Sequence, residues 1–409
     1  PPTATLTNPP PPPTTPYATH LPYTPLFRSR LTLETTNTYT GGTIISAGVL
    51  QADATKALGA GLVTLNGGGL SNNVSATLSN VVNMTVASVI GVGSGQNLTI
   101  AGAVTNGNGA LTKVGTGTLV LAGNSTYTNG TTLSNGTVSL QATAAPGTYS
   151  IGSGATLSFD TNSALNSATT TFTGNGTLKL ANGISFNSSG GIYVGLSAGG
   201  LVLVTSNVTV TGSANSHGFW TNNLASLQVD AGSTINFQEA GGQTYAQFDA
   251  LNGGGRASIG QGGARTIIVG AANGSGTFSG ELYNDPAGAN RITALQKTGT
   301  GRQTLTGTNT YTGTTTISGG TLALSGGGSI SNSPTIIIAG GATLDVSGKT
   351  TTYALGSRTL TNSSAGAVIN GTNDCSTGTI SLLYDATNSC FTITNGGMTL
   401  SASTTVKVN

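Results

Sequence analysis

The sequence has little charge, few aromatic rings and almost no glutamate, and each shortage excludes a class of protein. Only 6% of the 409 residues are charged and the formal net charge is +2. The chain therefore lacks the basic surface that binding to nucleic acid or an anionic membrane requires. Glu, a strong helix former, occurs three times, which argues against an α-rich domain. No apolar run is long enough to span a membrane as a helix.

Histidine and cysteine are also scarce. The two histidines are His20 and His217 and no Cys-x-x-Cys pair occurs, so we predict no metal site and no cofactor. A Ser-His-Asp triad would depend on His217, and a lone histidine is more often structural. The glycine-rich run at 253–265 lacks the Lys-Ser/Thr pair of a phosphate-binding loop, so we discard that interpretation as well.

Glycine, threonine, serine and asparagine are abundant, and Leu, Ile and Val are spaced among them. The chain contains 64 Gly. A polar composition of this kind can indicate disorder. Here, however, aliphatic residues recur at every second position in short runs, which is typical of strands with one buried face. The composition therefore indicates an all-β protein with a packed interior.

One stretch of the chain occurs twice in similar form. Residues 113–140 and 297–324 align without a gap at an offset of 184 residues. They share K-x-G-T-G at the start, T-Y-T in the middle and G-T-x-x-L at the end. A partial third copy, residues 31–52, aligns with the first full copy at an offset of 88 residues. Agreement over this length indicates an internal repeat.

The repeat unit predicts how the chain folds. Its last part, TTTIS-GG-TLALS, contains two short strands separated by glycines, with Ile317, Leu322 and Leu324 on one face. One unit cannot bury that face alone, but stacked copies can. The rival arrangement, hairpins in a sandwich or propeller, usually has bulky aromatic cores and even antiparallel spacing, which this chain lacks. We therefore predict a parallel β-helix (β-solenoid), a single elongated rod, right-handed like most parallel crossovers.

The repeated pattern resembles the autotransporter-associated β-strand repeat of bacterial surface proteins. The two full copies carry the resemblance, and residues 57–68 resemble the segment that follows such a repeat. The family implies a parallel β-helix that is exported and displayed on the cell surface or released from it. The sequence shows no export signal and no membrane barrel. The resemblance to autotransporters implies that, if the chain comes from one, an outer-membrane barrel lies elsewhere in the full-length protein.

One repeat departs from the pattern. Arg302 and Gln303 stand where the earlier copy has Thr118 and Leu119. This places a polar side chain at an inward position. We therefore expect a loosened coil, or the end of the run of coils, at this point.

The two ends of the chain differ from the rest. Residues 1–30 contain most of the 13 prolines, including a run of five at 9–13, and the repeat pattern breaks off there. This segment reads as a proline-rich linker or as foreign sequence, similar to translated sequencing-adapter DNA. It is not a signal peptide, and we expect it to be disordered or not native. Residues 31–374 are predicted to form the β-helix, and 375–409 its C-terminal strands.

The C-terminal strands contain the two cysteines of the chain. Cys375 and Cys390 are separated by 14 residues. Two thiols in an exported chain with no other cysteine favour a disulfide over a metal site. A bridge closing a loop of this size would contribute about 3 kcal/mol of stability. We therefore predict a disulfide that pins a C-terminal cap.

The least repetitive segment, residues 217–291, is the candidate ligand patch. It holds the only Trp and nearly half of the carboxylates, and carbohydrate sites combine aromatic faces with carboxylates. The alternative, which we favour, is that the aromatic rings stack inside the coils while the charges lie in solvated loops. The candidate ligand residues are Phe219, Trp220, Asp230, Tyr245, Asp249 and Arg256.

Three functions fit this pattern. The first, which we favour, is an exported, non-catalytic cell-surface fibre or stalk, and the second is an adhesin that binds an extracellular glycan or a host or neighbouring cell surface. The third is a β-helical polysaccharide lyase or hydrolase, which needs clustered acids. Most acids here lie ten or more residues apart, although the coils could still bring Asp230, Asp249 and Arg256 together. We predict no catalytic residue.

Overall fold

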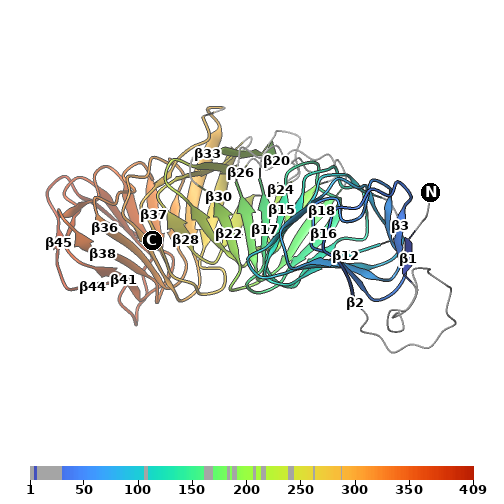
Figure 1. The fold of residues 1–409 in the computed structure, drawn as a ribbon. Helices are drawn as coiled ribbons and strands as arrows, with labels where there is room; N and C mark the ends of the chain where they lie inside the picture. The colour runs from blue at the N-terminus through green and yellow to red at the C-terminus, as the bar shows by residue number, and fades with distance from the viewer. Residues whose placement is uncertain are drawn as a thin grey trace. The chain divides into compact units, whose positions relative to one another are not determined.

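The computed structural model describes residues 4–6, 30–105, 109–160, 169–181, 185–186, 191–205, 209–212, 218–237, 244–260, 263–286 and 288–409. Within these ranges, every element of regular secondary structure is a β-strand, and the described strand pairs run parallel. Consecutive strands belong to different sheets, so the chain winds from sheet to sheet and returns one layer further on (Figure 1). The predicted parallel β-helix is therefore confirmed.

The chain forms two compact units, and the first comprises residues 1–184 and 188–191. Three parallel sheets surround its interior. One sheet contains β1 (Ala4–Leu6), β3 (Thr43–Ile45), β5 (Val63–Leu65), β8 (Val82–Met84) and β11 (Val104–Thr105). A second contains β2 (Arg30–Leu33), β4 (Val49–Ala52), β6 (Gly69–Asn72), β9 (Ser88–Val92), β12 (Leu111–Val114), β14 (Thr131–Leu133), β16 (Gly147–Ile151) and β18 (Thr170–Gly174). The third contains β7 (Ala76–Leu78), β10 (Asn97–Ile100), β13 (Thr118–Leu121), β15 (Thr137–Leu140), β17 (Thr156–Phe159) and β19 (Thr177–Leu180).

The second unit comprises residues 185–187 and 192–409 and is built in the same way. Its longest run of paired strands contains β22 (Leu201–Val204), β25 (Ser226–Val229), β28 (Leu251–Gly253), β31 (Gly276–Phe278), β34 (Arg302–Leu305), β36 (Thr321–Gly326), β38 (Thr343–Lys349), β41 (Ala367–Asn370) and β44 (Phe391–Thr394). Another contains β27 (Tyr245–Phe248), β30 (Gly263–Val269), β33 (Arg291–Lys297), β35 (Thr315–Ile317), β37 (Thr335–Ile338), β40 (Thr359–Asn362), β43 (Thr379–Leu382) and β46 (Thr405–Val408). A further sheet contains β20 (Ser185–Phe186), β23 (Thr209–Gly212), β26 (Thr234–Phe237), β29 (Arg256–Ile259) and β32 (Glu281–Leu282). A small sheet contains β39 (Tyr353–Ala354), β42 (Asn373–Asp374) and β45 (Met398–Thr399). Finally, β21 (Ile192–Val194) pairs with β24 (Gly218–Phe219).

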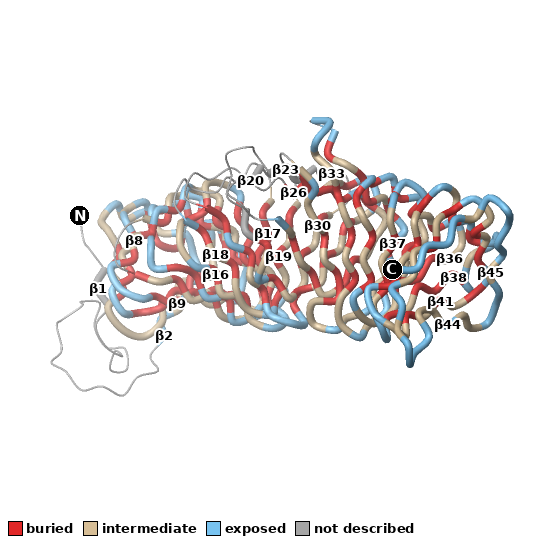
Figure 2. The backbone as a smooth tube through the Cα atoms, turned by 180° about the vertical axis from the view of Figure 1, so that it is seen from behind, coloured by how far each residue is buried: buried red, intermediate tan, exposed pale blue. Residues whose placement is uncertain are grey.

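The interior is made of columns of apolar side chains, most of them aliphatic. Buried residues alternate with more exposed ones along the strands of both units (Figure 2). In the first unit, the strand register stacks Ile100, Leu121, Leu140, Phe159 and Leu180 in one inward column, and none is more than 1% exposed. Full burial of such a side chain contributes roughly 1.5–3 kcal/mol. The columns therefore hold successive coils together.

The copies of the repeat fold alike. Equivalent strands β2, β13 and β34 pair with β4, β15 and β36 in the same register. In each copy the hydroxyl of the repeated tyrosine shares a hydrogen bond with the threonine four residues later. These pairs are Tyr39–Thr43 at 2.8 Å, Tyr127–Thr131 at 2.7 Å and Tyr311–Thr315 at 2.6 Å.

A buried lysine opens each full copy. Lys113 is fully buried, and its Nζ donates to the carbonyls of Val114 at 2.9 Å, Gly115 at 2.7 Å and Asn135 at 3.3 Å. The ammonium group has three N–H donors, so all three are used. Lys297, also fully buried, repeats this arrangement with Thr298, Gly299 and Gly319. The sequence alignment paired the two lysines but did not predict that they are buried.

The coil that contains Gln303 is neither loosened nor terminal, so this expectation was wrong. Gln303 is 2% exposed, and its amide donates to the Leu251 carbonyl at 2.8 Å and accepts from the Leu251 N–H at 3.0 Å. On β31, which lies between β28 and β34, the residue opposite Gln303 is Gly276. A Cβ atom at Gly276 would lie 2.7 Å from the Leu251 oxygen. Because Gly276 has no side chain, the Gln303 amide can reach past it and form two hydrogen bonds with the backbone of Leu251.

The predicted disulfide is a second correction. Cys375 and Cys390 are both free thiols in the structure. Cys375 is fully buried just after β42, whereas Cys390 is half-buried just before β44, a strand of a different sheet. The Cys390 thiol donates instead to the Leu383 carbonyl at 3.3 Å. Burial, the larger cause, and the neighbouring Asp374 raise the pKa of Cys375 to about 11, so its thiol stays protonated at neutral pH.

The predictions for the two terminal segments have different outcomes. Apart from β1 and Arg30, the proline-rich segment 1–30 lies outside the described residues, so the expectation of disorder stays a prediction. Residues 375–409 form β43 to β46, which pair in parallel with strands of the preceding coil. The C-terminal strands therefore continue the solenoid.

Candidate ligand-binding surface

The central residue of the predicted patch, Trp220, belongs to the core. It is 3% exposed, and its ring centroid lies 5.0 Å from that of Phe237 and 5.7 Å from that of Phe248. Phe237 and Phe248 are themselves 5.2 Å apart, so the three rings form one cluster inside the coil. Phe219 precedes Trp220 on β24, and its side chain lies outside the described residues. Trp220 therefore packs inside the coil with these rings.

Asp230 and Arg256 come to the same corner of neighbouring coils but bind different partners. The backbone N–H of Arg256 donates to the Ser233 carbonyl at 2.8 Å, and Ser233 closes the turn that begins at Asp230. The Asp230 carboxylate, however, accepts a hydrogen bond from Gln228 at 2.8 Å. Asp230 and Arg256 therefore share a corner, but they do not pair with each other.

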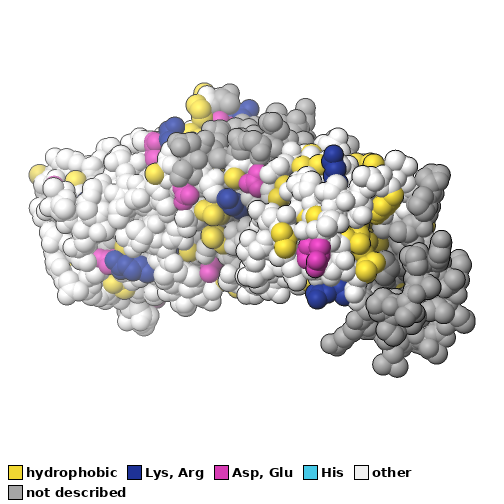
Figure 3. Space-filling model, viewed as in Figure 1, with side chains coloured by type: hydrophobic (Ala, Val, Ile, Leu, Met, Phe, Trp, Pro, Cys, Tyr) yellow, Lys and Arg dark blue, Asp and Glu magenta, His cyan; other side chains and the backbone are white. Residues whose placement is uncertain are grey.

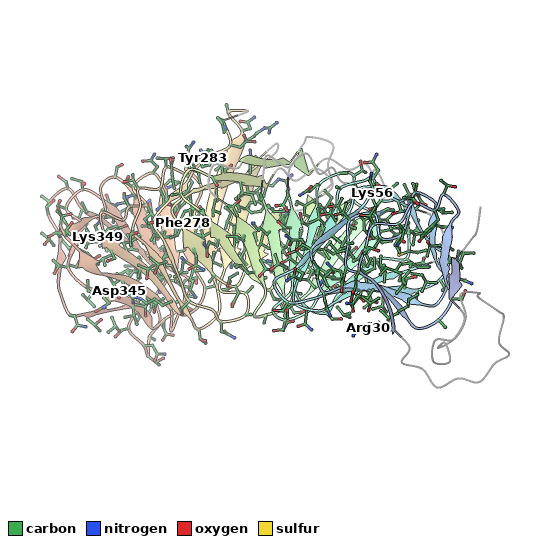
Figure 4. The ribbon with its side chains drawn as sticks, in the orientation of Figure 1. Arg30, Lys56, Phe278, Tyr283, Asp345 and Lys349 are labelled. Atoms are coloured by element: carbon green, nitrogen blue, oxygen red, sulfur yellow. The ribbon has the colours of Figure 1, made fainter. Side chains whose placement is uncertain are left out.

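The Arg256 guanidinium lies in a small surface cluster. It pairs with Glu281 at 2.8 Å and lies 4.1 Å from the centre of the Tyr283 ring, a cation–π contact. Glu281 also accepts a hydrogen bond from Thr310 at 2.5 Å. Tyr283, labelled in Figure 4, is only 8% exposed, and the guanidinium lies over its ring. This cluster offers no open aromatic face to a ligand.

Asp249 follows β27 and holds the backbone of the next coil. Its Oδ1 accepts from the N–H groups of Ala272 at 2.8 Å and Gly274 at 2.6 Å. Its charge also acts on Lys297. Burial lowers the pKa of Lys297 to about 8, and the Asp249 carboxylate opposes part of that shift. The geometry gives Asp249 a role in closing a corner of the coil.

Two ion pairs were not predicted from sequence. Arg291 pairs with Asp285 at 2.6 Å, and Arg302 pairs with Asp345 at 2.7 Å. Burial alone would raise the pKa of Asp345, but hydrogen bonds from Ser347 and Arg302 hold it below the ordinary value. Asp345 is labelled in Figure 4. Its ion-pair partner Arg302 lies on β34, 43 residues away in the sequence, so residue spacing carries no signal for this pair.

Charged and metal-ligating side chains are sparse among the described residues. Within the described ranges, no three His, Cys, Asp or Glu residues gather as metal ligands. On the face shown in Figure 3, charged side chains are few and separated by neutral surface. No described helix could span a membrane.

Comparison with known proteins identifies the repeat. Residues 29–52, 111–140 and 295–324 match the passenger-associated-transport-repeat family. These matches contain the three copies found above. The chain is also 37% identical over 119 residues to the adhesin BmaC autotransporter of Brucella suis biovar 1 (strain 1330). No solved structure matches the chain.

The matched region covers 28% of this chain and 3% of the Brucella protein, so the chain spans a small part of that relative. Repeats of this family belong to exported passengers, which places the chain outside the cell or on its surface. The family match and the parallel solenoid agree with each other. The chain therefore contains three copies of a passenger-associated-transport-repeat and is similar over part of its length to an autotransporter adhesin.

Proposed function

We propose that this passenger segment is a non-catalytic structural fibre that holds other parts of the protein away from the cell. The observation that carries the proposal is that its buried or half-buried charged and amide side chains bind the backbone of the coils. Asp249 binds two backbone N–H groups, Gln303 binds the Leu251 peptide, and Lys113 and Lys297 bind carbonyls. Each of these groups holds one coil to the next, so none is left to act on a substrate.

The outer surface supports the same role. Outward strand positions are mostly Thr, Ser and Asn, which are short, neutral and well hydrated. Attraction between such surfaces and other molecules is weak, and a low charge makes the fibre insensitive to salt. These are useful properties for a spacer outside the cell.

The second candidate is an adhesin, which the name of the Brucella relative favours. An adhesin needs an accessible surface that recognises a ligand, whereas a spacer does not. The enzyme alternative needs acids that meet in an open cleft. Asp230 and Asp249 follow strands of different sheets, which argues against their joint action.

A turnover screen tests the non-catalytic proposal. The purified chain would be incubated with neutral and acidic polysaccharides, and new reducing ends and unsaturated products would be measured. We expect no product above that of a heat-denatured sample. Product formation that is lost in Asp230→Asn, with folding unchanged by circular dichroism, would overturn the proposal. Binding without product would favour the adhesin over the passive spacer.

A further inference from the structure

Asn135 and Gly136 form the corner between β14 and β15 in the first full repeat. Asn135 is exposed, and its side-chain amide has no hydrogen-bond partner among the described residues. Within the same ranges, the Gly136 N–H likewise donates to no acceptor. Asparagine is chemically labile, because the backbone nitrogen of the next residue can attack its Cγ atom and displace the side-chain amide. Both reacting groups are free at this corner.

The preceding coil keeps Gly136 a glycine. Its φ is 69°, a left-handed value that glycine adopts without strain. A Cβ atom there would lie 2.5 Å from the Gly117 oxygen and 2.6 Å from the Gly115 oxygen. A side chain is therefore excluded at this position, and the nitrogen that faces Asn135 stays unhindered.

The buried lysine of the repeat lies against the same peptide group. Lys113 Nζ donates to the Asn135 carbonyl oxygen at 3.3 Å. When the Gly136 nitrogen loses its proton, resonance spreads the negative charge onto that oxygen. A neighbouring ammonium group stabilises an anion, and more so where water is excluded. Lys113 therefore favours the form of Gly136 that attacks Asn135.

Two other corners each lack one of these features. Asn175 is also exposed and precedes a glycine, but the Gly176 N–H donates to the Ile151 carbonyl at 3.0 Å. In the second full repeat, Lys297 Nζ donates to the Gly319 carbonyl at 3.3 Å, so the lysine is in place but the asparagine is not. The chain thus contains its own controls for the nitrogen and for the asparagine.

We propose that Asn135 is a deamidation site that the buried Lys113 promotes. The Gly136 nitrogen gives its proton to hydroxide and bonds to Asn135 Cγ. The bond from Cγ to the side-chain nitrogen breaks, and that nitrogen takes a proton from water and leaves as ammonia. Water then opens the succinimide, at Cγ to give aspartate or at the backbone carbonyl carbon to give isoaspartate. No oxidant or reductant is needed.

The position of the lysine also selects the product. The oxygen that receives the Lys113 hydrogen bond belongs to the backbone carbonyl, so the ammonium stabilises the oxyanion that forms when water attacks there. Isoaspartate, the product of that attack, adds one carbon to the main chain. Gly136 has no room to shift, so the added carbon strains the corner. The first full repeat therefore loosens with age, whereas the second, with Gly319 at this place, does not.

The test is long incubation of the whole folded chain at neutral pH, followed by peptide mapping with mass spectrometry and enzymatic methylation of isoaspartate. We expect Asn135 to lose its amide faster than the matched Asn175, with isoaspartate as the main product. Lys113→Met should slow the reaction at Asn135 about tenfold, the effect of one hydrogen bond to a charged group. The rate at Asn175 should not change.

Gly319→Asn is the converse variant. It places an asparagine over the Lys297 ammonium and before Gly320, whose φ of 59° is close to that of Gly136. This chain should gain deamidation at the new asparagine, and the result decides the question if Lys113→Met does not fold. The proposal is overturned if Asn135 and Asn175 react at equal rates, if the new asparagine stays intact, or if folded Lys113→Met reacts as fast as the unaltered chain.

Discussion

The passenger repeats and the segment 217–291 fill the same kind of interior with different side chains. In the repeats, the columns are aliphatic, and the same lysine, tyrosine and threonine recur at an offset of 184 residues. In 217–291, Trp220 and two phenylalanines fill the coil instead. The parallel ladder continues through both regions. The fold therefore requires inward apolar volume and paired backbone groups, and the repeated residues are one way to supply them.

The largest effect should come from breaking the repeat interior. Ile317 is fully buried on β35, so Ile317→Asp places a charge where water cannot reach it. We expect a loss of more than about 4 kcal/mol, the range of severe core substitutions. Urea unfolding followed by far-ultraviolet circular dichroism measures the loss. Thr316→Asp, on the outward face of the same strand, should change stability by less than about 0.5 kcal/mol. Equal effects of the two variants would contradict the inward assignment.

The buried lysines should give the repeats a distinctive pH dependence. Burial lowers the pKa of Lys113 from 10.5 to about 8. Between these values the unfolded chain binds more protons than the folded chain, so this lysine makes stability rise as pH increases from 8 to 10.5. Lys113→Met should reduce that rise in urea unfolding measured at several pH values. A variant with the same pH profile as the unaltered chain would show that the ammonium is not buried.

Buried tyrosines act in the opposite direction at higher pH. Burial raises the pKa of Tyr127 to about 12, and the hydrogen bond shared with Thr131 opposes part of that shift. Its contribution to stability is present below pH 10 and is lost as pH rises through 12. When the pH dependence of stability of Lys113→Met is subtracted from that of the unaltered chain, the contribution of Tyr127, which both chains share, cancels. The difference then reports the lysine alone.

A reciprocal exchange between the two full repeats tests the Gln303 contact. Gln303→Leu gives the last repeat the Leu found at 119, but it leaves the N–H and carbonyl of Leu251 without this partner. We expect a loss of about 1–3 kcal/mol, the cost of an unpaired buried polar group. Leu119→Gln, at a fully buried position without such a partner, should also destabilise the chain. If Gln303→Leu stabilises the chain, the hydrogen bonds between Gln303 and Leu251 do not contribute to stability.

The parts of the fold that sequence could predict are those set by short-range pattern. Alternating aliphatic residues, glycine-marked corners and the repeated segment were sufficient to predict strands and a solenoid. The role of Gln303 was not predictable, because Leu251 lies 52 residues away and is reached only over Gly276. The two cysteines were misread because sequence separation does not show that they belong to different sheets.

The candidate site depended on strand phase, which sequence alone left open. Trp220 was named as a ligand residue, yet it faces the core, whereas Tyr193, which faces outward, was not named. A shift of one residue reverses the two faces of a strand. Glycines and short turns separate these strands, so no continuous alternation fixes the phase. Of the original patch, the structure places Tyr245 and Arg256 on the outer face.

The smallest effect should come from the surface cluster of the 217–291 segment. Arg256 pairs with Glu281 and covers Tyr283, but the Arg256 side chain is 51% exposed. Water and salt screen such a pair, so Arg256→Ala should cost less than about 1 kcal/mol. Arg256→Lys keeps the charge but loses the planar stacking on Tyr283, so comparing the two variants separates the cation–π contact from the ion pair. Thermal unfolding at low and high salt makes the measurement. A loss as large as that of Ile317→Asp would mean that this cluster, like the repeats, holds the coils together.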